Sequence, residues 1–119
     1  MPFSTRVLLF FGGLTGAAGV MLAAAAYHSA NPVLQSAALI CLANGPAMIG
    51  LSLLARSTPV ALAAGLVMTL GTVLFAGDLL SASYLGQGLF RMSAPIGGSA
   101  VIAGWLIAAL AALLPAGRK

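Results

Sequence analysis

The sequence predicts an all-α integral membrane protein, an up-down antiparallel four-helix bundle with both termini in the cytoplasm. Hydrophobic residues make up 61% of the 119 residues and charged residues only 5%, whereas soluble domains carry about 25% charged residues. Inside a bilayer every backbone polar group needs a partner within the protein, so only helices and closed barrels can span it. The long apolar runs favour helices, because barrel strands alternate polar and apolar residues.

Four segments are long enough to span the membrane, since about 20 apolar residues cross about 30 Å of hydrocarbon. They lie at approximately 7–26, 33–55, 59–84 and 93–114, within one domain that covers residues 1–119. Short links separate them, so we expect neighbouring helices to be antiparallel. The first segment resembles a signal peptide, but its apolar stretch is longer than usual, and we expect it to be retained.

The distribution of basic residues predicts the orientation. The N-terminus, the second link and the C-terminus fall on one side of the membrane, and Arg91 alone falls on the other. By the positive-inside rule, the more basic side is cytoplasmic. These basic residues are scattered singly, which argues against a nucleic-acid partner. The cytoplasmic side carries Arg6, Arg56, Arg118 and Lys119.

Small residues recur four positions apart, a spacing that lets membrane helices approach closely. The stretch GGLTGAAG holds two such ridges, one with Gly12 and Gly16 and one with Gly13 and Ala17. The ridges either hold the four helices together or leave one face for another protein, and four helices need fewer contact faces than the chain offers. Further expected packing positions are Gly97, Gly98, Gly104 and Trp105, the last as a wedge in the core or a contact for a neighbour, with the core favoured.

Asp78 is the only acidic residue. It stands nineteen residues after Pro59, or about 28 Å along a helix, which places it at the outer interface beside His28 and Arg91. We expect a polar cluster there, in which Asp78 ties the helix ends together through Arg91 or His28. The competing interpretation, a proton- or cation-handling site, is weaker because intramembrane acids are functional suspects mainly when they lie deep in the membrane.

The stretch CLANGPAMIG places Asn44, Gly45 and Pro46 near the middle of the second span. A proline inside a helix removes one backbone hydrogen bond and separates one turn. A broken helix at this depth is typical of transporter sites. A simple kink is favoured here, with Asn44 bonded to Thr15, Thr69 or Thr72, since no second broken helix accompanies it.

Nothing in the sequence indicates catalysis, a metal or a cofactor. The chain has one cysteine and one histidine, too few for a zinc site or for bis-histidine haem ligation. It also lacks a nucleophile elbow, a phosphate-binding loop on a strand and paired carboxylates. We therefore expect no enzyme activity and no cofactor.

Several motifs resemble the YgdD-like family of small inner-membrane proteins, a domain of unknown function. The resemblance lies in APIGGSAVIAGWLIAALAAL, in LFAGDLLSASYLG and in GGLTGAAG followed by His28. It implies a four-span protein of the bacterial inner membrane and no established activity.

Three functional hypotheses follow. The first is a non-catalytic accessory or stabilising subunit that packs against other integral membrane subunits of a larger complex. The second is a small oligomeric transporter or ion-conducting protein that uses Asp78. The third is a lipid- or quinone-binding membrane protein, which needs a pocket near Pro46.

Overall fold

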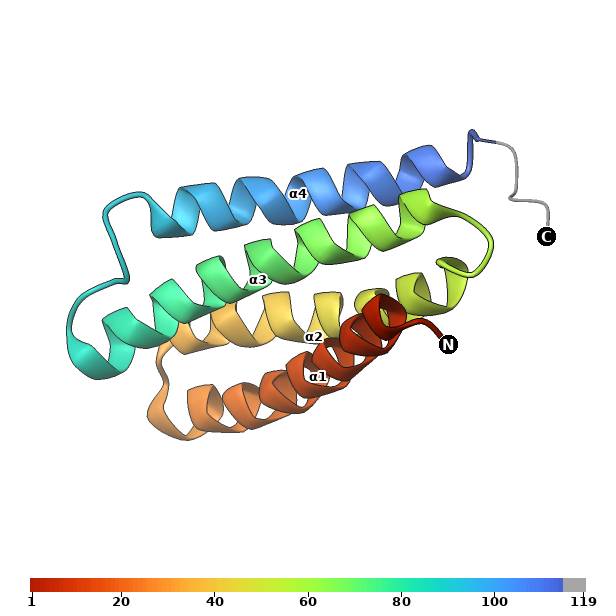
Figure 1. Ribbon diagram of the computed structural model, residues 1–119. Coiled ribbons are helices and arrows are strands. Elements are labelled where there is room, and N and C mark those ends of the chain that lie inside the picture. The colour runs from red at the N-terminus through yellow and green to blue at the C-terminus, as the bar shows by residue number, and fades with distance from the viewer. Residues whose placement is uncertain (115–119) are drawn as a thin grey trace.

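The computed structural model describes residues 1–114, and these residues form four helices. The helices run antiparallel to their neighbours along the chain (Figure 1). Each is long and apolar enough to cross a membrane, so the predicted all-α fold class is confirmed. The elements are α1 (Phe3–Ser29), α2 (Pro32–Leu54), α3 (Pro59–Leu85) and α4 (Ser93–Ala111).

The helix ends differ slightly from the predicted spans. α1 extends beyond the predicted range 7–26 at both ends, and α4 ends at Ala111 instead of near residue 114. The first difference has a simple reason: Ser4, Arg6, His28 and Ser29 are polar but continue the helix. Hydropathy detects the apolar part of a helix, not its hydrogen-bonded ends.

Side-chain caps start the two central helices. The Asn31 side-chain oxygen accepts a hydrogen bond from the backbone amide of Val33 at 2.9 Å, and Pro32 lies between them in the first turn of α2. Thr58 does the same for α3, accepting from the amide of Val60 at 3.2 Å. These caps satisfy amides that a helix start leaves without partners, and a proline fits the first turn because its nitrogen needs none.

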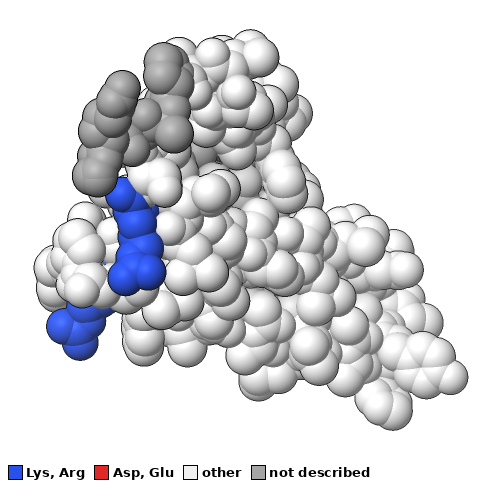
Figure 2. All heavy atoms as spheres, turned by 90° about the vertical axis from the view of Figure 1, so that its right-hand side faces the viewer, with Lys and Arg blue, Asp and Glu red and all other residues white. Residues whose placement is uncertain are grey.

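The bundle has two ends, which we call the terminal end and the opposite end. The terminal end holds the start of α1, the turn between α2 and α3 and the end of α4, and the opposite end holds the other two links (Figure 1). Arg6 and Arg56 lie at the terminal end, where arginines are the charged side chains in view (Figure 2). Arg118 and Lys119 lie outside the described residues.

The helices pack mainly as two pairs, α1 with α2 and α3 with α4, joined where α2 meets α3. α1 also contacts α3 near the terminal end, where Leu8 packs against Gly65. The larger core cluster lies there and consists of Leu8, Met48, Leu51, Ala61, Ala64 and Met68. α2 and α3 are therefore the central helices, and α1 and α4 keep much of their surface exposed.

Glycines set the distance between the helices of each pair. A Cβ added to Gly45 would lie 2.6 Å from the backbone nitrogen of Gly16 in α1. In the other pair, a Cβ on Gly97 would lie 2.5 Å from the backbone nitrogen of Phe75. These backbones touch directly, the close approach that small residues permit in membrane helices.

The other expected packing glycines differ in how tightly they are held. A Cβ on Gly12 would come within 2.9 Å of Ile49, and one on Gly104 within 2.9 Å of Met68. At Gly98 the nearest atom would be 3.6 Å away, an ordinary contact. Gly16 itself has room for a Cβ, although its backbone lies under Gly45. The ridge containing Gly12 and Gly16 therefore faces α2, whereas Gly13 has open space around it.

Candidate functional site

A polar triad centred on the buried Asn44 joins three helices near the middle of the bundle. The side-chain amide of Asn44 in α2 donates to the hydroxyl oxygen of Thr72 in α3 at 2.9 Å. The indole N–H of Trp105 in α4 donates to the amide oxygen of Asn44 at 3.0 Å. Asn44 is 1% exposed, so the two bonds satisfy a polar group that is costly to bury alone. The triad fixes α2, α3 and α4 relative to one another.

Sequence reasoning anticipated one of the two hydrogen bonds of this triad. Thr72 was one of three threonines expected to bond with Asn44, and Thr69 instead donates to the backbone carbonyl of Gly65 within its own helix. The bond to Trp105 was missed. The indole is 45% exposed, so the ring lies at the bundle surface rather than in the core that we expected for it. Its N–H turns inward because Asn44 offers an acceptor there.

α2 continues as one helix through Pro46, from Pro32 to Leu54. Gly45 lies against α1, and Pro46 lies on the exposed side of the helix. The three residues of the predicted kink thus serve different neighbours: Asn44 contacts α3 and α4, Gly45 contacts α1, and Pro46 borders a groove.

That groove, which we call the α2–α4 groove, is apolar and has a volume of about 400 Å³. It begins beside the triad and extends along α2 toward the terminal end. α2 supplies one wall, Trp105 and Ala108 supply the other, and Met68 of α3 lies between them. Its lining residues include Ala43, Pro46, Leu54, Met68, Trp105 and Ala108.

At the opposite end, Asp78 holds the link between α3 and α4. Its carboxylate accepts from the backbone amide of Leu89 at 2.9 Å and lies against Gly88. The hydroxyl of Ser81, one turn further along α3, donates to the carbonyl of Gln87 at 2.6 Å. The carboxylate and the hydroxyl together hold the link onto the last turns of α3.

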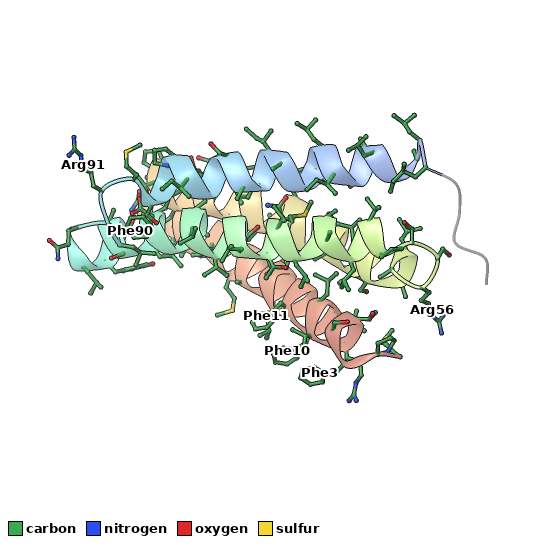
Figure 3. The ribbon with its side chains drawn as sticks, turned by 45° about the horizontal axis from the view of Figure 1, so that its top comes forward. Phe3, Phe10, Phe11, Arg56, Phe90 and Arg91 are labelled. Carbon is green, nitrogen blue, oxygen red and sulfur yellow. The ribbon has the colours of Figure 1, made fainter. Side chains whose placement is uncertain are left out.

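The three residues expected in one polar cluster are not joined to one another by hydrogen bonds in the described chain. Asp78 and Arg91 border the same polar hollow of about 460 Å³, but the Arg91 side chain points away from the bundle (Figure 3). His28 is exposed and packs edge-on against Tyr27, with ring centroids 5.6 Å apart. Asp78 therefore holds the α3–α4 link through the backbone amide of Leu89, and not through Arg91 or His28 as expected.

The outward face of α1 has no partner among the described helices. Phe3 is 79% and Phe10 61% exposed, and both project away from the other helices (Figure 3). Gly13 and Ala17 continue this face and are exposed as well. A Cβ added at Gly13 would meet no atom within 4 Å. Of the two ridges in GGLTGAAG, one is therefore used inside the bundle and the other is free.

The described residues contain no group of three or more His, Cys, Asp or Glu side chains that could hold a metal ion.

No curated protein and no solved structure matches the chain. A family model described as a protein of unknown function (DUF423) matches residues 15–98, from the middle of α1 into the first turns of α4. The matched region contains Asn44, Thr72 and Asp78, whereas Trp105 lies beyond it. Since this match covers more than half of the sequence, the chain belongs to the DUF423 family.

Proposed function

We propose that this protein is a non-catalytic accessory or stabilising subunit that packs against a larger complex of the bacterial inner membrane. In this proposal it is a YgdD-like small inner-membrane protein with both termini in the cytoplasm. The observation that carries the proposal is the outward face of α1.

This face has the period of a helix–helix contact. The exposed side of α1 contains a row of residues spaced alternately three and four positions apart, and a row with this spacing can lie as one seam against a partner helix. Gly13 and Ala17 in its middle would let a second backbone approach closely. The residues of this face are Phe3, Arg6, Phe10, Gly13, Ala17, Val20 and Ala24.

The use of the polar side chains supports a non-catalytic role. Asn44, Thr72 and Trp105 bind one another, and Asp78 binds a backbone amide. Each of these groups is occupied in holding helices or a link in place. A catalytic site needs polar groups that converge on a substrate.

The second hypothesis, a transporter that uses Asp78, has less support. The carboxylate lies near the end of α3, where it organises the adjacent link, and not at the midplane where transporters place their sites. An Asp78→Asn variant separates the two roles. A carrier would lose coupled transport in proteoliposomes, whereas a structural tie would change only stability or assembly.

One specific observation supports the third hypothesis, lipid or quinone binding. It needed a pocket near Pro46, and Pro46 borders the α2–α4 groove. This groove shares no residue with the outward face of α1, so a subunit role and a ligand role are compatible.

Native purification tests the subunit proposal. A tagged chain is extracted from its own membranes in mild detergent, separated by blue-native electrophoresis, and its companions are identified by mass spectrometry. Stoichiometric migration with a larger complex is the expected result. Migration only as a monomer or small homo-oligomer would refute the subunit role.

A further inference from the structure

The α2–α4 groove has the length of one membrane leaflet. Its lining residues in α2 run from Ala43 to Leu54, eleven residues apart, which is about 16 Å at about 1.5 Å per residue. One leaflet contributes half of a hydrocarbon core about 30 Å thick. The groove therefore runs from near the midplane, beside the Trp105–Asn44 bond, to the terminal end of the bundle.

The volume of the groove matches that of a thin occupant. A helix with a diameter of about 10 Å and a length of about 16 Å occupies roughly 1,200 Å³, three times the volume of about 400 Å³ in the groove. Small-molecule sites commonly measure about 300–1,000 Å³. A single hydrocarbon chain fits within this space, whereas a helix could insert only its side chains.

The basic residues at the terminal end, where the groove ends, indicate the head group of that occupant. Arg56 follows Leu54 by two residues and is exposed in the turn after α2, where Figure 3 shows it extending from the terminal end of the bundle. Arg6 lies at the same end, and the one acidic residue of the chain, Asp78, lies at the opposite end. The terminal end of the bundle, where the groove ends at Leu54, is therefore cationic and suits an anionic group.

We propose that the α2–α4 groove holds one acyl chain of an anionic glycerophospholipid from the leaflet at the terminal end, with the phosphate next to Arg56. The end of the acyl chain farthest from the phosphate lies against the Trp105 ring, whose orientation is held by the hydrogen bond to Asn44. The subunit role does not depend on this lipid, because the two proposals rest on different faces of the bundle.

The protein carries its own reporter for this test. Trp105 is its only tryptophan and lines the groove, so bromine atoms on an acyl chain in the groove would quench its fluorescence by contact. The full chain is reconstituted in phosphatidylcholine vesicles, and brominated phosphatidylglycerol or brominated phosphatidylcholine is added at a small, equal mole fraction. One basic residue near a membrane surface contributes about 1 kcal/mol of attraction to anionic lipid, so we expect phosphatidylglycerol to quench with about fivefold preference. High salt should reduce this preference.

Two pairs of variants locate the lipid. Arg56→Gln should remove most of the preference for phosphatidylglycerol, and Arg91→Gln, at the opposite end, should leave it unchanged. Gly50 lines the groove and has open space around it, so Gly50→Leu should fill the groove and reduce quenching by both lipids. Ala63→Leu adds bulk at an exposed position of α3 that does not line the groove and should have no effect. Circular dichroism checks that each variant remains helical.

Equal quenching by the two brominated lipids in the unaltered protein would overturn the proposal. It would also fail if Arg91→Gln acted like Arg56→Gln, since the charge effect would then not be local to the groove. The same holds if Trp105 were quenched as strongly in Gly50→Leu as in Ala63→Leu, because the acyl chain would then lie elsewhere on the surface.

Discussion

The indole N–H of Trp105 and the side-chain oxygen of Asn44 lie 3.0 Å apart, and this hydrogen bond joins α4 to α2. The main packing neighbour of α4 is α3. The bond therefore strengthens the contact between α2 and α4, which apolar packing alone leaves weak. Because Asn44 also binds Thr72, one amide determines how three helices are placed.

Replacing Asn44 with Ala should destabilise the bundle by roughly 1–3 kcal/mol. Each hydrogen bond between membrane helices is worth about 0.6 kcal/mol on average, and truncating a buried side chain adds a cavity cost. The check is reversible unfolding in detergent, with Gln35→Ala, an exposed polar residue of the same helix, as the control. Equal stability of Asn44→Ala and Gln35→Ala would show that the triad contributes nothing.

Trp105→Phe isolates the single bond to Asn44. The phenyl ring keeps an aromatic surface but has no N–H, so the expected loss is about 0.6 kcal/mol. In a double-mutant cycle with Asn44→Ala the two changes should be non-additive by a similar amount, since both remove the same contact. Additive effects would mean that the hydrogen bond carries no stability.

Gly45→Ala and Gly16→Ala should differ sharply, although the two glycines touch. The added methyl group on Gly45 would lie 2.6 Å from backbone, whereas the one on Gly16 would meet nothing within 4 Å. Overpacking of this kind typically costs about 1–3 kcal/mol. Detergent unfolding should therefore show a loss for Gly45→Ala and little change for Gly16→Ala. Equal losses would indicate that α1 and α2 approach each other differently.

Asp78→Ala should loosen the link between α3 and α4 without unfolding the bundle. The change removes the acceptor of the Leu89 amide, and a hydrogen bond is worth about 0.5–1.5 kcal/mol. Hydrogen exchange at Leu89 should accordingly rise by a few-fold to about tenfold. Asp78→Asn keeps an oxygen at the same place and should retain most of the protection. Unchanged hydrogen exchange at Leu89 in Asp78→Ala would show that the carboxylate does not hold the link.

The sequence predicted what depends on composition and spacing. Four apolar segments separated by prolines indicated the helices. Small residues four apart indicated that Gly16 lies in a close helix contact, although its partner Gly45 was assigned only to the kink. Asn44 was expected to have a threonine partner, because a polar group near the midplane must find one.

The sequence could not predict the contacts that depend on the angle between two helices or on the conformation of a link. The Trp105–Asn44 bond requires α4 to lie next to the polar side of α2, which no local pattern specifies. The choice between Gly12 and Gly13 as the buried ridge depends on how α1 is rotated about its axis. Asp78 was assigned a cationic partner because charges are visible in a sequence, whereas the backbone amide of Leu89 becomes its neighbour only through the folded link.

The most direct test of the subunit role combines the outward face of α1 with native electrophoresis. A Gly13→Leu, Ala17→Leu variant places bulk on that face, and Ala63→Leu places the same side chain on an exposed position of α3. We predict that the unaltered protein and Ala63→Leu migrate with a larger complex, and that the α1 variant is released from it while remaining helical. Retention of the α1 variant in the complex would contradict the proposed interface, and migration of the unaltered protein on its own would contradict the subunit role itself.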